Sequence, residues 1–379
     1  MQKENKKLRT AIVHEWLTFY AGSEKCVESF TNIWKDADVF VLFDFMNSID
    51  RKKVIKDILP HTSFLQKFPG AKKHYRNLLP FFPYAIEQFD LSGYDLIISS
   101  SHAVAKGVLT NSNQLHINYC HTPMRYAWDL YHQYLNESNL KNGLKGLFAK
   151  IFLHYIRLWD IAAAHRVDYF IANSTYISRR IHKVYRRNST VIHPPVDTEK
   201  FPCCFEKDDY FLTASRFVPY KKIDVIVEAF SQMTDKKLIV IGEGPDELKI
   251  KSKAAGNITF LGYQSDERLS EYLQKAKAFV FAAEEDFGIM VVEALSCGTP
   301  VIAFNKGGIT DTIIEGQTGI LFTEQTTASI KHAVNRFEKN SGKFIPSELN
   351  DYAKKFDRQN FETNIKNFVD NKCNEFFNP

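Results

Sequence analysis

Short apolar runs alternate with longer amphipathic segments along most of the chain. The apolar runs predict buried strands at residues 10–16, 37–43, 94–100, 168–174, 210–215, 237–242, 258–262 and 278–283. Helical periodicity follows several of them, most clearly at residues 23–34, 144–166, 222–233 and 352–377. Because strands that alternate with helices form parallel sheets covered on both faces, the pattern predicts an α/β fold.

The length of 379 residues is about twice that of a usual domain, which favours two domains. Pro194 and Pro195 interrupt regular structure near the middle of the chain and stiffen a connection. We therefore predict an N-terminal domain at 1–193, a C-terminal domain at 194–355 and a terminal helical segment at 356–379.

Composition excludes several classes of protein. Charged residues make up 25% of the chain with a net charge of +5, which argues against an acidic disordered chain and a dedicated nucleic-acid binder. The six cysteines form no C-x-x-C pair, so we expect reduced thiols, with no disulfide and no zinc. We find no signal-peptide core and no run of roughly twenty apolar residues, and expect a cytoplasmic protein.

Basic and aromatic residues are interleaved at residues 64–89. The cations there are Lys67, Lys72, Lys73 and Arg76. Such a segment is either a membrane-surface patch, in which cations meet anionic head groups, or a core helix with a solvated basic face. The predicted helix at 144–166 belongs to the core and has basic residues on its other side, where a membrane-facing edge is a second interpretation.

The stretch 281–300 carries the clearest candidate site. It predicts a strand at 278–283, a loop at 284–287 and a helix at 288–297 that Gly298 ends. The first helical amides, at Phe287, Gly288 and Ile289, have no partner within a helix and suit an anionic or polyhydroxyl ligand. Glu293 could then hold the two hydroxyls of a ribose, with Glu285 across the helix start. The alternative is two solvated glutamates beside an ordinary core helix.

Three further candidates follow predicted strands. Arg216 and Lys221 come after the strand at 210–215, where two cations can neutralise a diphosphate or simply face water. His121 follows an apolar run that starts at residue 115, a position that is either a ligand contact or a structural histidine. Gly22 lies between the first strand and its helix, which indicates a ligand-binding turn or a plain tight turn.

Several of these motifs together resemble the retaining glycosyltransferases of family 4. They are E-x7-E with Phe-Gly after the first acid, E-A-L-x-x-G-T-P-V-I, R-x4-K and C-H-T-P. The resemblance implies the GT-B fold, in which two Rossmann-like parallel-sheet domains face a cleft and a C-terminal helix crosses back to the N-terminal domain. The chain departs from the family at Ala21, where a second glycine is usual, and at Lys222, where glycine is common.

The resemblance also implies residue roles. Arg216 and Lys221 would bind the donor pyrophosphate, and the segment around Gly262 and Tyr263 would hold the nucleotide base. His121 and Glu285 would be the catalytic residues at the transferred sugar, with Glu285 as a positioning and electrostatic group rather than a covalent nucleophile. Asn173 and Ser174 would lie near the acceptor cleft.

The implied reaction is a metal-independent transfer of a hexosyl group from a nucleoside-diphosphate sugar to a hydroxyl, with retention at the anomeric carbon. The motifs look most like bacterial mannosyltransferases that build O-antigen or other surface polysaccharides, which favours GDP-mannose as donor and a polyprenyl-linked or glycan acceptor. Peripheral contact with the inner membrane would suit that acceptor. The alternatives are a UDP-sugar donor, a nucleotide-sugar epimerase, and a sugar-nucleotide-binding subunit without activity.

Overall fold

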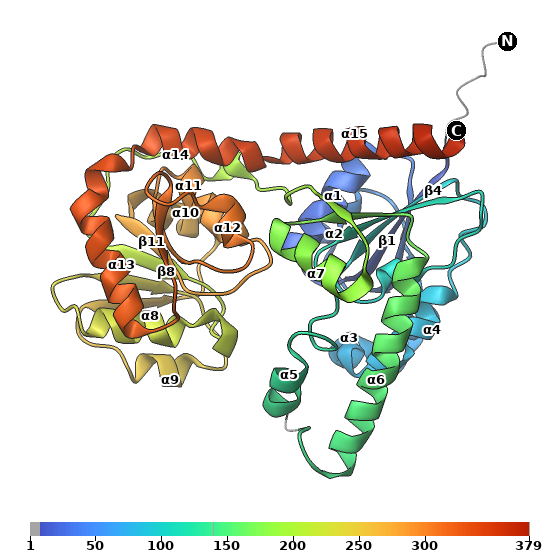
Figure 1. The fold of residues 1–379 in the computed structure, drawn as a ribbon, viewed down its shortest axis with the longest axis horizontal. Helices are drawn as coiled ribbons and strands as arrows, with labels where there is room; N and C mark the ends of the chain where they lie inside the picture. The colour runs from blue at the N-terminus through green and yellow to red at the C-terminus, as the bar shows by residue number, and fades with distance from the viewer. Residues whose placement is uncertain (1–7, 139, 379) are drawn as a thin grey trace. The chain divides into compact units, whose positions relative to one another are not determined.

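The computed structural model describes residues 8–138 and 140–378. The chain divides into two units, Met1–Pro194 with Phe361–Pro379, and Pro195–Asn360. The sequence had placed these divisions at 193/194 and 355/356. Both units are α/β, and each builds its own parallel sheet (Figure 1).

The N-terminal unit contains a seven-stranded sheet in the order β3-β2-β1-β4-β5-β6-β7. Its strands are β1 (Thr10–Leu17), β2 (Asp38–Asp44), β3 (His61–Thr62), β4 (Leu96–Ser101), β5 (Leu115–Cys120), β6 (Tyr169–Ala172) and β7 (Ser189–Val191). All of their pairings are parallel. The side chains of successive residues in a strand point to opposite faces, so Ile12 enters one apolar cluster and Val13 another. The strands are consequently apolar on both faces, as parallel sheets require.

Helices cover both faces of this sheet (Figure 1). The helices of this unit are α1 (Gly22–Ile33), α2 (Ser48–Ile55), α3 (Ala71–His74), α4 (Phe82–Glu87), α5 (Tyr131–Glu137), α6 (Gly143–His165), α7 (Thr175–Tyr185) and, from residue 361 on, α15 (Arg358–Phe377). Within the described residues, no helix is both long enough and apolar enough to cross a bilayer.

The C-terminal unit contains a six-stranded parallel sheet in the order β10-β9-β8-β11-β12-β13. Its strands are β8 (Phe211–Ala214), β9 (Leu238–Ile241), β10 (Ile258–Gly262), β11 (Ala278–Phe281), β12 (Val301–Phe304) and β13 (Gly319–Phe322). Its helices are α8 (Ile223–Ser231), α9 (Glu247–Lys251), α10 (Asp266–Lys275), α11 (Ile289–Ser296), α12 (Ile309–Thr312), α13 (Thr327–Asn340) and α14 (Pro346–Ala353).

The terminal helix packs on the N-terminal unit, as the fold prediction requires. Phe361, Ile365 and Val369 of α15 are buried in the same apolar cluster as Phe30 of α1 and Tyr119 of β5. The predicted continuous helix at 352–377 is wrong, however, because the chain is extended at Asp357 between α14 and α15. The Asp357 carboxylate accepts a hydrogen bond from the Asn360 amide at 2.7 Å, which starts the new helix.

Residues 64–89 also differ from the single helix that was one interpretation of this segment. They form the short helices α3 and α4 and two 3-10 turns, Phe64–Lys67 and Tyr75–Phe81. Gly70 adopts a left-handed φ of 76° before α3. Pro80 and Pro83 lack a backbone N–H and so limit the length of the helical turns that follow. The segment is therefore a series of turns with many exposed side chains.

Candidate functional site

In each sheet, the strand order reverses at one pair of neighbouring strands. In the N-terminal sheet the strand order runs outward on either side of β1 and β4, and in the C-terminal sheet on either side of β8 and β11. The connections leave such a pair toward opposite faces, so a crevice opens at the carboxyl ends of the two strands, where open α/β sheets bind ligands. The predicted chemical residues lie at the carboxyl ends of these strands or of their neighbours in the same sheet.

In the C-terminal unit, the loops after β8 and β11 bring Lys221 and Glu285 together. Lys221 ends a short 3-10 turn, Pro219–Lys221, and its ammonium forms an ion pair and hydrogen bond with the Glu285 carboxylate. The side chains are 19% and 16% exposed, so both remain within reach of a ligand. Arg216, on the loop that follows β8, is exposed and forms no ion pair with any described residue. Two cations and one carboxylate therefore lie around the strand-order reversal.

Close backbone packing fixes the loop that carries Glu285. The Gly308 amide donates to the Glu285 carbonyl at 2.8 Å, and Glu285 forms a parallel β-bridge with Gly307. A Cβ atom on Gly307 would lie 2.3 Å from that carbonyl oxygen, and one on Gly308 would lie 2.2 Å from the Asp286 carbonyl oxygen. Only glycine permits this approach, so Gly307 and Gly308 position Glu285 through the main chain.

Helix α11 starts directly after this loop. Gly288 is its N-cap with φ 88°, and the helix runs from Ile289 to Ser296, shorter than the predicted 288–297. Glu293 lies in the middle of the helix and is only 7% exposed, which contradicts the interpretation of a solvated glutamate. Phe287 is buried against Phe356, with ring centroids 5.7 Å apart. The main-chain amides of Phe287, Gly288 and Ile289 thus belong to a fixed turn at the helix start.

The segment predicted to hold a nucleotide base lies on neighbouring loops of the same sheet edge. Gly262 ends β10 with a φ of 67°, and its carbonyl accepts the Gly242 amide at 2.8 Å. A Cβ atom on Gly242 would lie 1.8 Å from the Ser215 carbonyl oxygen, so the loops after β8, β9 and β10 are in main-chain contact. Tyr263 is 72% exposed beside them.

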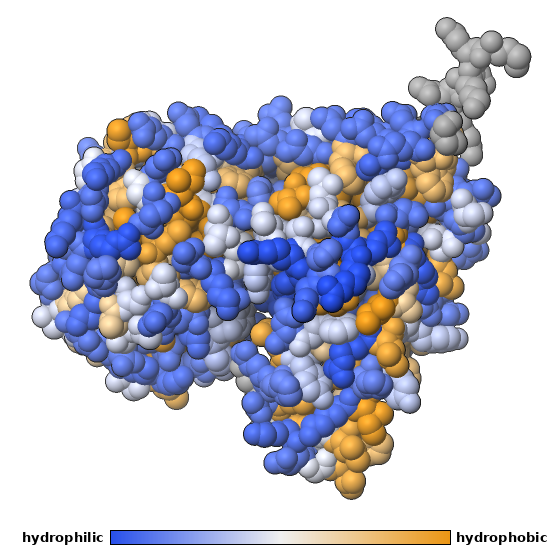
Figure 2. Space-filling model, viewed as in Figure 1, coloured by the Kyte–Doolittle hydropathy of each residue, from blue (hydrophilic) through white to orange (hydrophobic). Residues whose placement is uncertain are grey.

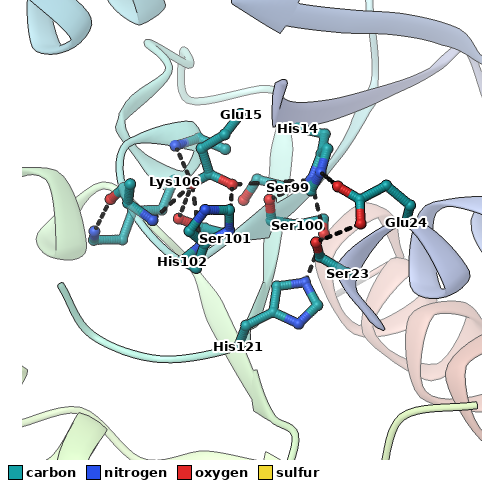
Figure 3. Close-up of polar contacts among 12 residues, drawn as sticks. His14, Glu15, Ser23, Glu24, Ser99, Ser100, Ser101, His102, Lys106 and His121 are labelled. Carbon is teal, nitrogen blue, oxygen red and sulfur yellow. Dashed lines mark hydrogen bonds and ion pairs between the residues drawn. The ribbon is translucent and has the colours of Figure 1, made fainter. Parts of the chain in front are cut away.

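In the N-terminal unit, His121 belongs to a connected polar network (Figure 3). It follows β5, and its Nε2 lies 2.8 Å from the Ser100 hydroxyl at the end of β4. The same hydroxyl lies 3.2 Å from Nδ1 of His14 on β1. Burial, together with the positive charges of His102 and His14, lowers the pKa of His121 to about 3. His121 is therefore a neutral imidazole at pH 7, suited to hydrogen bonding rather than to carrying charge.

Glu15 organises the loop that follows β4. Its Oε1 accepts hydrogen bonds from the Ser101 hydroxyl and from the amides of His102, Ala103 and Ala105, at 2.8–3.1 Å. Its Oε2 lies 3.2 Å from Nδ1 of His102, whose side chain is 28% exposed. Burial raises the pKa of Glu15, but the charges of His102 and His14 and the amide hydrogen bonds outweigh it and lower the pKa to about 2. Glu15 is thus a buried, permanent carboxylate.

His14 links this network to the turn that contains Gly22. Its Nε2 lies 3.5 Å from the Glu24 carboxylate, which also accepts the Ala21 amide at 3.2 Å and the Ser23 hydroxyl at 3.0 Å. Burial lowers the pKa of His14, but the hydrogen bond and charge of Glu24, the charge of Glu15 and the Ser100 hydrogen bond give a net rise. Gly22 is the first residue of α1, at the same end of β1.

The last two predicted residues have clear structural contacts. The Asn173 amide donates to the His121 carbonyl at 3.0 Å, so it helps to hold the His121 loop. Ser174 is the N-cap of α7, where its hydroxyl accepts the Ile177 amide at 3.2 Å. Both are buried at the carboxyl end of β6.

Sequence reasoning missed four members of the N-terminal network: His14, Glu15, Glu24 and His102. The signal that could have found them is their position, because the polar pair His14-Glu15 interrupts an apolar strand and His102 directly follows Ser99-Ser100-Ser101 on a neighbouring strand. Polar residues at the carboxyl ends of adjacent parallel strands meet at one edge. Among the described residues, no group of three histidine, cysteine or acidic side chains is arranged to hold a metal ion.

Two family models match the chain and together span most of it. Residues 37–200 match the model "Glycosyltransferase Family 4", and residues 196–358 match "Glycosyl transferases group 1". An uncharacterized glycosyltransferase of Methanocaldococcus jannaschii is 25% identical over 348 residues, which cover 89% of this chain and 91% of that protein. The D-inositol 3-phosphate glycosyltransferase of Rhodococcus erythropolis is 27% identical over 185 residues, 41% of this chain and 42% of that protein.

Solved structures share the fold over nearly the whole chain. Anabaena Alr3699/HepE, crystallised with UDP, superposes with a TM-score of 0.69 at 16% identity and covers 96% of this chain and 100% of its own. The lipopolysaccharide outer core galactosyltransferase WaaB superposes with a TM-score of 0.67 at 17% identity, with the same shares of each chain covered. With its two parallel-sheet units and two matching domain models, the chain is a glycosyltransferase of the GT-B type.

Proposed function

We propose that this glycosyltransferase moves a hexosyl group from a nucleoside-diphosphate sugar to a hydroxyl of a lipid-linked glycan, with retention at the anomeric carbon. The observation that carries the proposal is the Lys221–Glu285 pair beside exposed Arg216, at the strand-order reversal of the C-terminal sheet. A diphosphate needs cations and a sugar needs a hydrogen-bond acceptor for its hydroxyls, and these side chains supply both.

The roles follow from the charges. Arg216 and Lys221 neutralise the diphosphate, which is also the leaving group, so they stabilise the charge that develops as the glycosidic bond breaks. The α11 start adds main-chain amides to the same anion. Glu285, held by the Gly307 and Gly308 main chain, orients the sugar hydroxyls. In this proposal the two cations do the work of a metal ion, and buried Glu293 binds the ribose.

The N-terminal network supplies a second, polar site. His121 is neutral and is held by Ser100 and Asn173, so its ring is fixed in an orientation that suits a hydrogen bond to a sugar hydroxyl. Partly exposed His102, backed by Glu15, is the neighbouring group that can contact an acceptor hydroxyl. In a front-face substitution the leaving phosphate takes the acceptor proton, so neither histidine needs to act as a strong base.

Two donors remain candidates. The C-H-T-P and S-R-F-V-P-Y-K-K motifs favour GDP-mannose and assembly of a surface polysaccharide such as O-antigen. The structures of Anabaena Alr3699/HepE with UDP and with UDP-glucose favour a UDP-sugar. Tyr263 and the loop after β10, the proposed base site, decide between the two.

The first test is thermal stabilisation by nucleotides. A ligand that binds only the folded chain stabilises it by RT ln(1 + [L]/Kd), so GDP, UDP and ADP and their common sugars can be compared without an acceptor. We expect one nucleotide to raise the melting temperature, equally with magnesium or with a chelator. Stabilisation that disappears with the chelator would contradict the metal-free proposal, and no stabilisation by any nucleotide would contradict the donor site.

Lys221→Ala tests the cation role. A hydrogen bond to a charged group contributes about 1.5–3 kcal/mol, so nucleotide affinity should fall by a factor of about ten to one hundred. The matched control is Lys222→Asn, which removes the adjacent cation but suits the left-handed φ of 57° at this position. Calorimetric titration with the preferred nucleotide measures both. Equal losses in the two variants would indicate general charge attraction instead of a specific contact.

A further inference from the structure

Helix α6 has an apolar stripe, from Leu144 to Leu158, that the fold leaves largely exposed. Six side chains recur every three or four residues along one side of the helix and are 46–77% exposed: Leu144, Leu147, Phe148, Ile151, Tyr155 and Leu158. Figure 2 shows part of this stripe as apolar surface at the free end of α6. We call these six residues the α6 stripe.

The stripe is separate from the face that α6 presents to the core. Leu153, Ile156, Ala163 and Ala164 of the same helix are buried in the N-terminal unit. The core of the unit is therefore built from a different side of the helix. Contiguous exposed apolar surface of this kind marks an interaction site in soluble proteins.

A second exposed apolar group lies on residues next to α6. Phe64, Phe68, Phe81 and Tyr84 are 48–59% exposed. Their segment touches α6 directly, since Trp159 Nε1 of α6 donates to Glu87 of α4 at 2.8 Å, and Phe82 shares a core cluster with Ile156. The two exposed groups thus belong to adjoining parts of one unit.

Cations predominate in the segments that carry both groups. Seven exposed cations accompany them: Lys67, Lys72, Lys73, Arg76, Lys141, Lys145 and Lys150. Residues 64–89 and 141–158 contain one carboxylate, Glu87, and it is bound by Trp159 and Arg166. Apolar side chains surrounded by cations match a bilayer surface, where acyl chains take up the former and anionic head groups attract the latter.

We propose that the α6 stripe and its flanking lysines dock this glycosyltransferase on an anionic lipid surface. The helix lies in the head-group region, with Leu147 and Phe148 entering the acyl boundary and Lys145 and Lys150 contacting lipid phosphates. The inference deepens the proposed function, since a lipid-linked acceptor gives such docking its use. Lipid binding needs neither donor nor acceptor, so it is measured independently of transfer.

The test is flotation of the full chain with vesicles. We expect binding to phosphatidylglycerol-containing vesicles, weaker binding at high salt, and little binding to pure phosphatidylcholine. Leu147→Ser with Phe148→Ser should lower the partition coefficient at least about tenfold. Lys145→Glu with Lys150→Glu should weaken binding to anionic vesicles by a similar factor and leave phosphatidylcholine binding unchanged.

Matched controls come from the same unit. Ile49 on α2 is 81% exposed, and Lys35, which follows α1, is also exposed. Ile49→Ser and Lys35→Glu therefore make the same types of substitution at positions outside α6. Both should bind vesicles like the unaltered chain. Unchanged binding by the α6 variants, or equal loss in the controls, would overturn the proposal. A dimer in gel filtration that Leu147→Ser with Phe148→Ser makes monomeric would instead assign the stripe to a second copy of the chain.

Vesicle binding without stabilisation by any nucleotide would support the docking surface and contradict the donor site. Nucleotide stabilisation without vesicle binding would do the reverse. The two results therefore separate failure of the docking proposal from failure of the proposed function.

Discussion

At the residue scale, the sites at the two strand-order reversals differ in how their charges are balanced. The Lys221–Glu285 pair is partly exposed, so either partner can exchange its contact for a ligand group. Glu15, by contrast, is fully buried and already accepts four hydrogen bonds at one oxygen. An oxygen that accepts four hydrogen bonds holds a loop in place, while the other oxygen of Glu15 faces His102 at 3.2 Å.

Glu285→Gln tests the positioning role of this carboxylate. The amide has nearly the same shape but no charge, so it should stabilise the developing positive charge on the sugar less well. We expect turnover to fall about a hundredfold, with nucleotide affinity within about threefold of the unaltered chain. The neighbouring Glu284→Gln is the control, because Glu284 pairs with Lys306 at 3.1 Å. Steady-state transfer kinetics with the preferred donor measure both, and unchanged turnover in Glu285→Gln would reject the role.

The sequence indicated the C-terminal site better than the N-terminal one for a physical reason. Arg216, Lys221, Glu285 and Glu293 belong to local motifs with fixed spacing, and spacing is visible in a sequence. His14 and Ser100 lie on β1 and β4, and His121 directly follows β5. The three meet only because β1, β4 and β5 are neighbours in the sheet. Strand order is a property of the whole unit, which no local pattern carries.

At the element scale, strands were predicted more reliably than helix ends. Parallel strands buried on both faces are continuous apolar runs, so β1, β2 and β11 overlap the predicted runs closely. Helix ends depend on single capping contacts. The Asp357 cap that separates α14 from α15 is one polar residue in an amphipathic segment. Periodicity alone therefore predicts one continuous helix across it.

Gly307→Ala tests whether main-chain packing holds the loop that carries Glu285. The new Cβ would clash with the Glu285 carbonyl oxygen at 2.3 Å, in addition to the strain of a φ of 82°. Gly316→Ala is the control, since its φ of 76° is similar but nothing lies within 4 Å of the new Cβ. We expect a loss of about 1 kcal/mol in the free energy of unfolding for Gly316→Ala and about 2 kcal/mol more for Gly307→Ala.

Denaturant titration followed by circular dichroism measures these losses, and nucleotide-induced stabilisation gives a second readout. Gly307→Ala should also bind nucleotide more weakly, because the clash moves Glu285 and the α11 start. Equal losses and equal nucleotide responses in the two variants would show that the Gly307 contact does not position the loop.

At the scale of the whole molecule, the two units can be observed separately. All four tryptophans, Trp16, Trp34, Trp128 and Trp159, lie in the N-terminal unit. Tryptophan fluorescence therefore reports unfolding of that unit alone, even when both units are present. This matters because a two-domain chain need not unfold in one step.

One buried and one partly buried histidine of the N-terminal unit should make it sensitive to acid. Burial and the charge of Arg166 lower the pKa of His116 to about 3, and His121 has a pKa of about 3 as well. Both stay neutral in the folded unit but bind a proton in the unfolded chain below a pH of about 6.5, so their contribution to stability falls as pH decreases. The contribution of His14 to stability changes with pH in the opposite direction. Its raised pKa gives stability that is lost only as pH rises above about 6.5.

Two extra protons in the unfolded state correspond to a slope of about 2–3 kcal/mol per pH unit between pH 6 and 5. Glu15, with its pKa of about 2, adds a further loss below a pH of about 4.5. Urea titrations monitored by tryptophan fluorescence at pH 7, 6, 5.5 and 5 measure the slope. His116→Gln removes one of the two titrations and should roughly halve the slope whatever its effect on stability at pH 7, because slope depends on protons and not on packing. A free energy of unfolding that stays constant from pH 6 to 5 would mean that His116 and His121 are protonated in the folded unit. The proposed role of His121 as a neutral hydrogen-bonding group would then be wrong.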